Sequence, residues 1–171
     1  TSSFGVTDQS YDLTFDILEG KFPKYKINSN PYNKKGRVEG ELVGGNLALI
    51  YALLGTNYSF NFKDKILFIE DIGENFYALD RMLMSLDLAG VFRKIKGLIV
   101  GGMTNMGDEK DNKNFGESFD EFAYKIISER ISKYDFPTIF GFPNGHIHDN
   151  RPLLIGGTVK MEVEEKVKVE F

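Results

Sequence analysis

Three short stretches of the chain are almost entirely apolar. They are "ILFIE" (66–70), "KGLIVGGM" (96–103) and "FPTIFGF" (136–142). A continuous apolar run of strand length is typical of a strand that is covered on both faces of its sheet. The pattern therefore predicts buried strands at the first two stretches and a further short strand at the third.

Apolar residues at helical spacing follow the first two stretches. Gly90 lies where the first helix would end, and a polar loop (104–116) precedes the second helix. Ser118 and Glu121 have the spacing of a capping box, which marks the start of that second helix. The residues expected on the apolar sides are Phe76, Leu79, Leu83 and Leu86 in the first helix, and Phe122, Ile126, Ile127 and Ile131 in the second.

The two ends of the chain have other patterns. Residues 37–55 predict a strand, a turn at Gly44-Gly45-Asn46 and a short helix that stops at Gly55. In residues 158–171, apolar and polar side chains alternate with a period of two, as in a half-buried antiparallel hairpin. Residues 1–36 are polar, with a short helix expected in "YDLTFDILEG" and a loop in "NSNPYNKKG". Strands alternating with helices predict an α/β domain with mixed sheets, two main helices and a terminal hairpin.

Composition limits the class of protein. The 171 residues suit one domain, and 42% hydrophobic with 27% charged residues describes an ordinary globular chain. The net charge of -4 and the absence of a basic stripe argue against nucleic acid, and no apolar stretch is long enough for a membrane span. The chain has no cysteine, which excludes thiolate chemistry and fits a reducing compartment.

Two carboxylates follow the first apolar run. The end of a buried strand is where α/β sheets place ligands, and Glu70 occupies that end. The simpler interpretation is that Glu70 or Asp71 caps the following helix, where a negative charge is favourable. The pattern alone leaves both interpretations open.

Both histidines of the chain lie in "GHIHDN" (145–150). Three interpretations compete: one imidazole is a general base, both bind a metal together with Asp149, or both are solvated loop residues. Glu70 and His146 could form a base and its orienting carboxylate. No serine lies in a glycine-flanked elbow such as G-x-S-x-G, so this pair would lack its nucleophile.

Four motifs in a fixed order resemble the C-terminal half of the LD-carboxypeptidase family. They are "GGNLALIYALLGTNYSF", "KILFIEDIGENFYALDRMLMSLDLAGVF", "GLIVGG" and "GHIHDNRPLLIGG". The family comprises serine peptidases that remove the terminal D-alanine from murein tetrapeptides, together with relatives that confer immunity to microcin C. The resemblance covers about residues 38–160 and implies a swivelling β/β/α domain.

The resemblance also implies roles for individual residues. Glu70 would orient and His146 would act as general base in a Ser-Glu-His triad, while Asn46 and Gly45 would line the substrate cleft, with His148 in a supporting role. The serine of the family lies on a separate N-terminal domain that this chain lacks. Residues 1–36 would then be the segment that follows the junction between the domains, and 37–171 the C-terminal domain.

The function implied is therefore that of half an enzyme. We expect a domain that supplies two triad members for peptidoglycan recycling, is inactive alone and needs no metal or cofactor. Its partners would be a murein peptide, the N-terminal nucleophile domain of the same protein and, as is common in the family, a second copy. The implied location is cytoplasmic. Two alternatives remain, a metal-dependent hydrolase that uses "HIHD" (146–149) and a non-catalytic murein-peptide binding or immunity domain.

Overall fold

A seven-stranded mixed sheet forms the centre of the computed structural model, which describes residues 7–107 and 119–171. The strand order is β1-β7-β6-β2-β3-β4-β5; β2 to β5 are parallel, and β1, β7, β6 and β2 are antiparallel. The strands are β1 (Lys24–Ile27), β2 (Gly36–Asn46), β3 (Ile66–Ile72), β4 (Gly97–Thr104), β5 (Thr138–Phe140), β6 (Thr158–Val163) and β7 (Val167–Glu170). The described helices are α1 (Asp8–Leu18), α2 (Leu47–Leu53), α3 (Phe76–Leu88), α4 (Val91–Lys94) and α6 (Phe119–Arg130).

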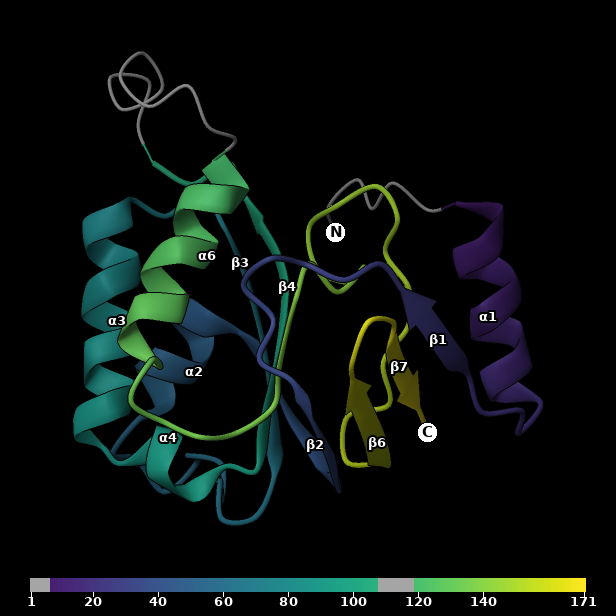
Figure 1. Cartoon of the computed structure of the whole chain (residues 1–171), viewed down its shortest axis with the longest axis horizontal. Helices are drawn as coiled ribbons and strands as arrows, with labels where there is room; N and C mark the ends of the chain where they lie inside the picture. The colour runs from purple at the N-terminus through teal and green to yellow at the C-terminus, as the bar shows by residue number, and fades with distance from the viewer. Residues whose placement is uncertain (1–6, 108–118) are drawn as a thin grey trace.

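Strand β2 belongs to both parts of the sheet. Its first half, from Gly36 to Glu41, pairs with β6, and its second half, from Leu42 to Asn46, pairs with β3. The ribbon of β1, β7 and β6 is thereby carried to the side of the parallel strands that faces away from α2, α3, α4 and α6 (Figure 1). Helix α1 lies beyond this ribbon (Figure 1). The predicted mixed α/β fold with a terminal hairpin is confirmed.

The parallel strands are buried on both faces, which explains their continuous apolar sequences. Leu67 and Ile69 of β3 lie in the core beneath the helices, whereas Ile66 and Phe68 lie in the core beneath the antiparallel ribbon. Successive side chains of a strand point to opposite faces, so both cores need an apolar residue at every position. The burial of "ILFI" therefore holds the end of β3, with Glu70, between two cores.

The predicted helices lie close to their expected bounds. Gly90 follows the end of α3 with a φ of 75°, a left-handed conformation that glycine adopts without steric cost. In α6, Ile127 is buried and Ile126 packs partly against the same core. Ser118 and most of the predicted polar loop lie outside the described residues. Within the described ranges, no helix is long and apolar enough to cross a membrane.

One predicted turn is wrong. Gly44, Gly45 and Asn46 do not leave the sheet, because β2 continues through them and pairs with β3 up to Asn46 opposite Glu70. A Cβ on Gly44 would lie 2.0 Å from the carbonyl oxygen of Phe68, so only glycine permits this pairing. The glycines therefore serve a close approach of two strands.

The leading segment contributes to the fold. Residues Lys24–Ile27 form β1, which pairs with β7, and Leu13 of α1 packs against the core beneath the ribbon. The sequence pattern had suggested only a loop in this part besides the helix. The division between this segment and a domain beginning at residue 37 stays a prediction.

Candidate active site

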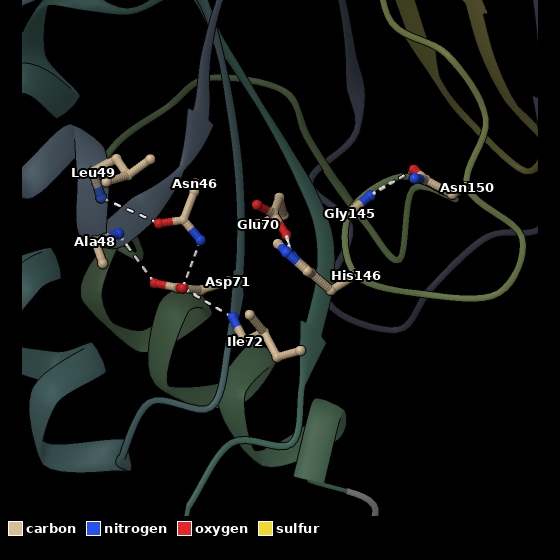
Figure 2. Close-up of polar contacts among 9 residues, drawn as sticks. All are labelled: Asn46, Ala48, Leu49, Glu70, Asp71, Ile72, Gly145, His146 and Asn150. Atoms are coloured by element: carbon tan, nitrogen blue, oxygen red, sulfur yellow. Dashed lines mark hydrogen bonds and ion pairs between the residues drawn. The ribbon is translucent and has the colours of Figure 1, made fainter. Parts of the chain in front are cut away.

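Glu70 and Asp71 lie near the end of β3 and point to opposite faces of the sheet (Figure 2). Glu70 is directed to the face of the 144–150 loop, and Asp71 to the face of α2 (Figure 2). Both are buried, with exposed fractions of 6% and 2%. A charged group this deeply buried requires a partner, so the partners indicate what each carboxylate does.

The neighbouring strand is irregular at this point. Ile69 pairs with Val100 but Asp71 pairs with Met103, so Gly101 and Gly102 together stand opposite Glu70. Such bulges are common next to active sites, where they redirect side chains.

Two glycines of β4 let the 144–147 segment lie directly on the strand. A Cβ on Gly101 would lie 2.4 Å from the carbonyl oxygen of Asn144, and one on Gly102 would lie 2.6 Å from Cγ2 of Ile147. The Gly102 N–H donates to that same carbonyl oxygen of Asn144 at 3.0 Å. The glycine pair therefore brings the histidine loop into contact with the end of the sheet.

This contact joins the two residues expected to act together. Nδ1 of His146 lies 2.8 Å from Oε2 of Glu70 (Figure 2). An ionised carboxylate only accepts hydrogen bonds, so Nδ1 carries the proton and Nε2 holds the lone pair in the neutral ring. The Glu70 side chain is 8% exposed and the His146 side chain 30% exposed, so the carboxylate is enclosed while the ring reaches solvent.

A cleft of about 340 Å³ opens beside the pair. Because Glu70 and His146 both line it, a small ligand in the cleft would contact the imidazole. No hydroxyl side chain lines this cleft in the part of the chain that the structure describes. The lining residues are Gly45, Phe68, Glu70, Asn144, Gly145, His146, Asn150, Leu153 and Ile155.

The expected binding residues differ in their placement. Gly45 lines the cleft, where a Cβ would meet no atom within 4 Å. Asn46 turns to the other face: its Oδ1 accepts from the Leu49 N–H at 3.2 Å and caps α2, and its Nδ2 donates to Asp71 at 2.8 Å (Figure 2). His148 is exposed and is not among the residues that line the cleft.

Asp71 does not cap the helix that follows it. Its Oδ2 accepts from the Ala48 N–H at 3.1 Å, in the first turn of the preceding helix α2, and Asn75 is the N-cap residue of α3. The N-terminus of α2 lies nearer because β2 and β3 are neighbours in the sheet. Burial raises the pKa of Asp71, and the hydrogen bonds from Ile72, Asn46 and Ala48 oppose this shift.

The neighbours of the two histidines bear on the metal alternative. Both carboxylate oxygens of Asp149 accept from the guanidinium of Arg151, at distances of 2.8 to 3.1 Å. Among the residues with described positions, no group of three or more His, Cys, Asp or Glu side chains is placed to hold a metal ion. The carboxylate that the metal alternative needs is thus engaged by an arginine.

Sequence reasoning missed the residues that hold the histidine loop. The Gly145 N–H donates to Oδ1 of Asn150 at 3.1 Å, and Nδ2 of Asn144 donates to the Arg151 carbonyl at 2.6 Å. Polar residues in a loop carry no periodic signal that would separate these contacts from ordinary solvated positions. Only the position of both asparagines within five residues of His146 pointed to them.

The fold and the cleft define an α/β domain that carries a carboxylate–imidazole pair at the C-terminal edge of its parallel strands, where such sheets bind ligands. Residues 39–161 match the family model described as the LD-carboxypeptidase C-terminal domain. The chain belongs to this family.

Named relatives agree with this assignment. The chain is 34% identical over 164 residues to the probable murein peptide carboxypeptidase of Bacillus subtilis, covering 96% of this chain and 49% of the relative. It is 27% identical over 143 residues to the microcin C7 self-immunity protein MccF of Escherichia coli, covering 83% of this chain and 39% of that protein.

A solved structure has the same fold. The crystal structure of muramoyltetrapeptide carboxypeptidase from Oxalobacter formigenes superposes with a TM-score of 0.82 at 26% identity, covering 96% of this chain and 54% of that one. The chain thus spans about half the length of the relatives it matches, or less.

Proposed function

We propose that this chain is the C-terminal domain of a serine-type LD-carboxypeptidase that releases terminal D-alanine from murein tetrapeptides. Glu70 and His146 would be two members of a Ser-Glu-His triad. The observation that carries the proposal is the 2.8 Å contact between Oε2 of Glu70 and Nδ1 of His146 at the cleft. Membership of the carboxypeptidase family gives this pair its expected chemistry.

The geometry suits a general base. The buried carboxylate fixes the imidazole with its proton on Nδ1, so Nε2 can take a proton from a hydroxyl group. The serine attacks the carbonyl carbon of the L-to-D peptide bond as His146 removes its proton. His146 then passes the proton to the nitrogen of the departing D-alanine as the C–N bond breaks, and Glu70 stabilises the imidazolium that exists between these steps. Water, deprotonated by His146, then cleaves the acyl–serine bond and the serine regains its proton.

The serine would come from an upstream domain of the same protein. Two observations support this part of the proposal: no hydroxyl side chain lines the cleft among the described residues, and the relatives are about twice as long as this chain. Without a nucleophile and oxyanion donors the pair has no acyl chemistry to assist, so the chain alone would be inactive. Location in the cytoplasm and a role in peptidoglycan recycling belong to the same proposal.

Binding of the substrate would involve the part of the cleft wall that β2 contributes. Gly45 lines the cleft, and its missing side chain leaves room for a peptide to approach the backbone of β2. Asn46 would act through the backbone geometry of this strand end, since its side chain is bound to α2 and Asp71. The supporting role of His148 remains part of the proposal, although its side chain is exposed.

The test is release of free D-alanine from a murein tetrapeptide. We expect release by the chain joined to its natural upstream sequence, no release by the chain alone, and none by the joined form with His146→Ala. Release by the chain alone, or by the His146→Ala form, would overturn the proposal.

Two further arms separate the alternatives. Treatment of the joined form with a chelator leaves release unchanged in a serine mechanism, whereas its loss favours the metal-dependent hydrolase. A joined form that binds the tetrapeptide but releases nothing favours the non-catalytic binding domain.

A further inference from the structure

Contacts of the backbone before His146 and of the His146 ring hold this part of the loop. The Asn144 carbonyl oxygen accepts from the Gly102 N–H, the Gly145 N–H donates to Oδ1 of Asn150, and the ring of His146 contacts Glu70 (Figure 2 shows the last two). The first of these ties the loop to β4, and the third is the proposed catalytic contact. The second lies between them, one residue before the histidine.

Gly145 is the point at which small movements of the backbone would matter most. It has a φ of 120°, a conformation that residues other than glycine rarely adopt. A Cβ there would lie 2.9 Å from Oε2 of Glu70 and 3.0 Å from its Cβ, so the Gly145 backbone packs directly against the carboxylate. Because glycine has wide conformational freedom, its own residue type does not fix this arrangement.

Asn150 restrains this backbone directly at Gly145. Its Oδ1 lies 3.1 Å from the Gly145 nitrogen, and the residue also lines the cleft. The hydrogen bond closes a short loop of six residues, 145–150, with His146 inside it. Rotation of the Asn144–Gly145 peptide would break this bond and shift the backbone that carries the His146 ring away from Glu70.

We propose that Asn150 is a positioning residue for His146: by accepting the Gly145 N–H, it holds the imidazole where Nδ1 meets Oε2 of Glu70. Asn150 does not touch the reacting atoms and acts through Gly145. The inference deepens the proposed function, since the importance of a fixed His146 rests on its role as a base. The geometric claim itself concerns this chain alone and needs no nucleophile to be tested.

The test uses ring ¹⁵N chemical shifts, which report which nitrogen of a neutral histidine carries the proton. The chain has only two histidines, so both are observed and exposed His148 serves as an internal reference. We expect the Nδ1–H form to predominate for His146 in the unaltered chain. Asn150→Ala should reduce the ratio of Nδ1–H to Nε2–H by roughly fivefold, the change expected from losing one neutral hydrogen bond.

A matched control separates positioning from general destabilisation. Oδ1 of Asn33 accepts from the Phe140 N–H at 2.8 Å, a long-range contact of the same type that does not involve the histidine loop. Asn33→Ala should lower the free energy of unfolding without changing the His146 ratio. Asn150→Asp keeps an acceptor oxygen opposite the Gly145 N–H and should keep the Nδ1–H form.

The outcomes decide the proposal in each direction. A folded Asn150→Ala chain with an unchanged His146 ratio would overturn it, as would an equal change in Asn33→Ala. If Asn150→Ala does not fold, Asn150→Ser provides the same comparison, because its hydroxyl is too short to replace the amide oxygen. Failure of the D-alanine assay would contradict the proposed function and leave this measurement intact.

Discussion

Glu70 and Asp71 are adjacent in sequence and both buried, yet their surroundings differ completely. Asp71 faces the helices and accepts from Asn46 Nδ2 at 2.8 Å, from the Ile72 N–H at 2.9 Å and from the Ala48 N–H at 3.1 Å. Glu70 faces the cleft and meets the ring of His146. One carboxylate is thus held by backbone and amide donors, and the other by a titratable side chain.

The difference teaches how to separate a structural carboxylate from a functional one. Backbone N–H groups cannot lose their protons, so the hydrogen bonds of Asp71 are fixed and link β3 to the start of α2. An imidazole can take up and release a proton, and that of His146 is partly exposed beside the cleft. Burial alone does not distinguish Glu70 from Asp71, because both side chains are buried.

The largest effect is expected for Glu70→Gln. In the chain joined to its upstream sequence, this change should reduce turnover on the order of 10³-fold or more, because the imidazole loses its orienting carboxylate. The measurement is kcat for release of D-alanine from a murein tetrapeptide. Near-normal turnover in a folded variant would show that Glu70 is not needed for the mechanism. The distinction between a functional Glu70 and a structural Asp71 would then be wrong.

Much of the fold could be predicted from the sequence because the apolar positions follow the core. The run "ILFI" placed β3 between two apolar layers, and the structure has a core on each side of it. The turn at Gly44-Gly45-Asn46 was wrong because glycines indicate both turns and close strand approaches. The difference lies in the neighbouring strand, here Phe68, whose position periodicity does not give.

The candidate site was predicted only in part, for a related reason. Glu70 and His146 were predicted from a strand end, a histidine motif and a family resemblance. In the structure, Oε2 of Glu70 lies 2.8 Å from Nδ1 of His146. The helix that Asp71 contacts could not be inferred, since strand pairing decides that α2 is the nearer helix. The hydrogen bond of Asn150 to Gly145 depends on loop geometry that no pattern of residue types encodes.

A smaller effect, on stability rather than turnover, is expected for Asp71→Ala. The change leaves two backbone N–H groups and the Asn46 amide without their acceptor, which should lower the free energy of unfolding by about 1–3 kcal/mol at pH 7. Urea unfolding measures it, with exposed Asp135→Ala as a control that should change stability by less than about 0.5 kcal/mol. Equal losses in both variants would contradict a structural role for Asp71.

The smallest effect concerns pH and compares Asp71 with Asp87, the other buried aspartate among the described residues. Burial raises the pKa of both carboxyl groups; in Asp71 it prevails, whereas in Asp87 the hydrogen bonds from Lys133 and Tyr134 outweigh it and leave the pKa lowered. Ionised Asp87 therefore stabilises the fold above its unfolded pKa of about 3.9, and this stabilisation is lost as pH falls through the lowered folded pKa. Asp71 has the opposite sign: its stabilisation is complete below about pH 3.9 and is lost as pH rises through the raised folded pKa.

The two aspartates should therefore give opposite slopes when each is replaced by asparagine. As pH rises, the stability of the unaltered chain should fall relative to Asp71→Asn above about pH 3.9 and rise relative to Asp87→Asn below it. Neither slope can exceed about 1.4 kcal/mol per pH unit, because each involves one proton. Urea unfolding at a series of pH values measures both. Slopes of the same sign would mean that the donors around Asp71 outweigh its burial, so that its ionised form, like that of Asp87, stabilises the fold.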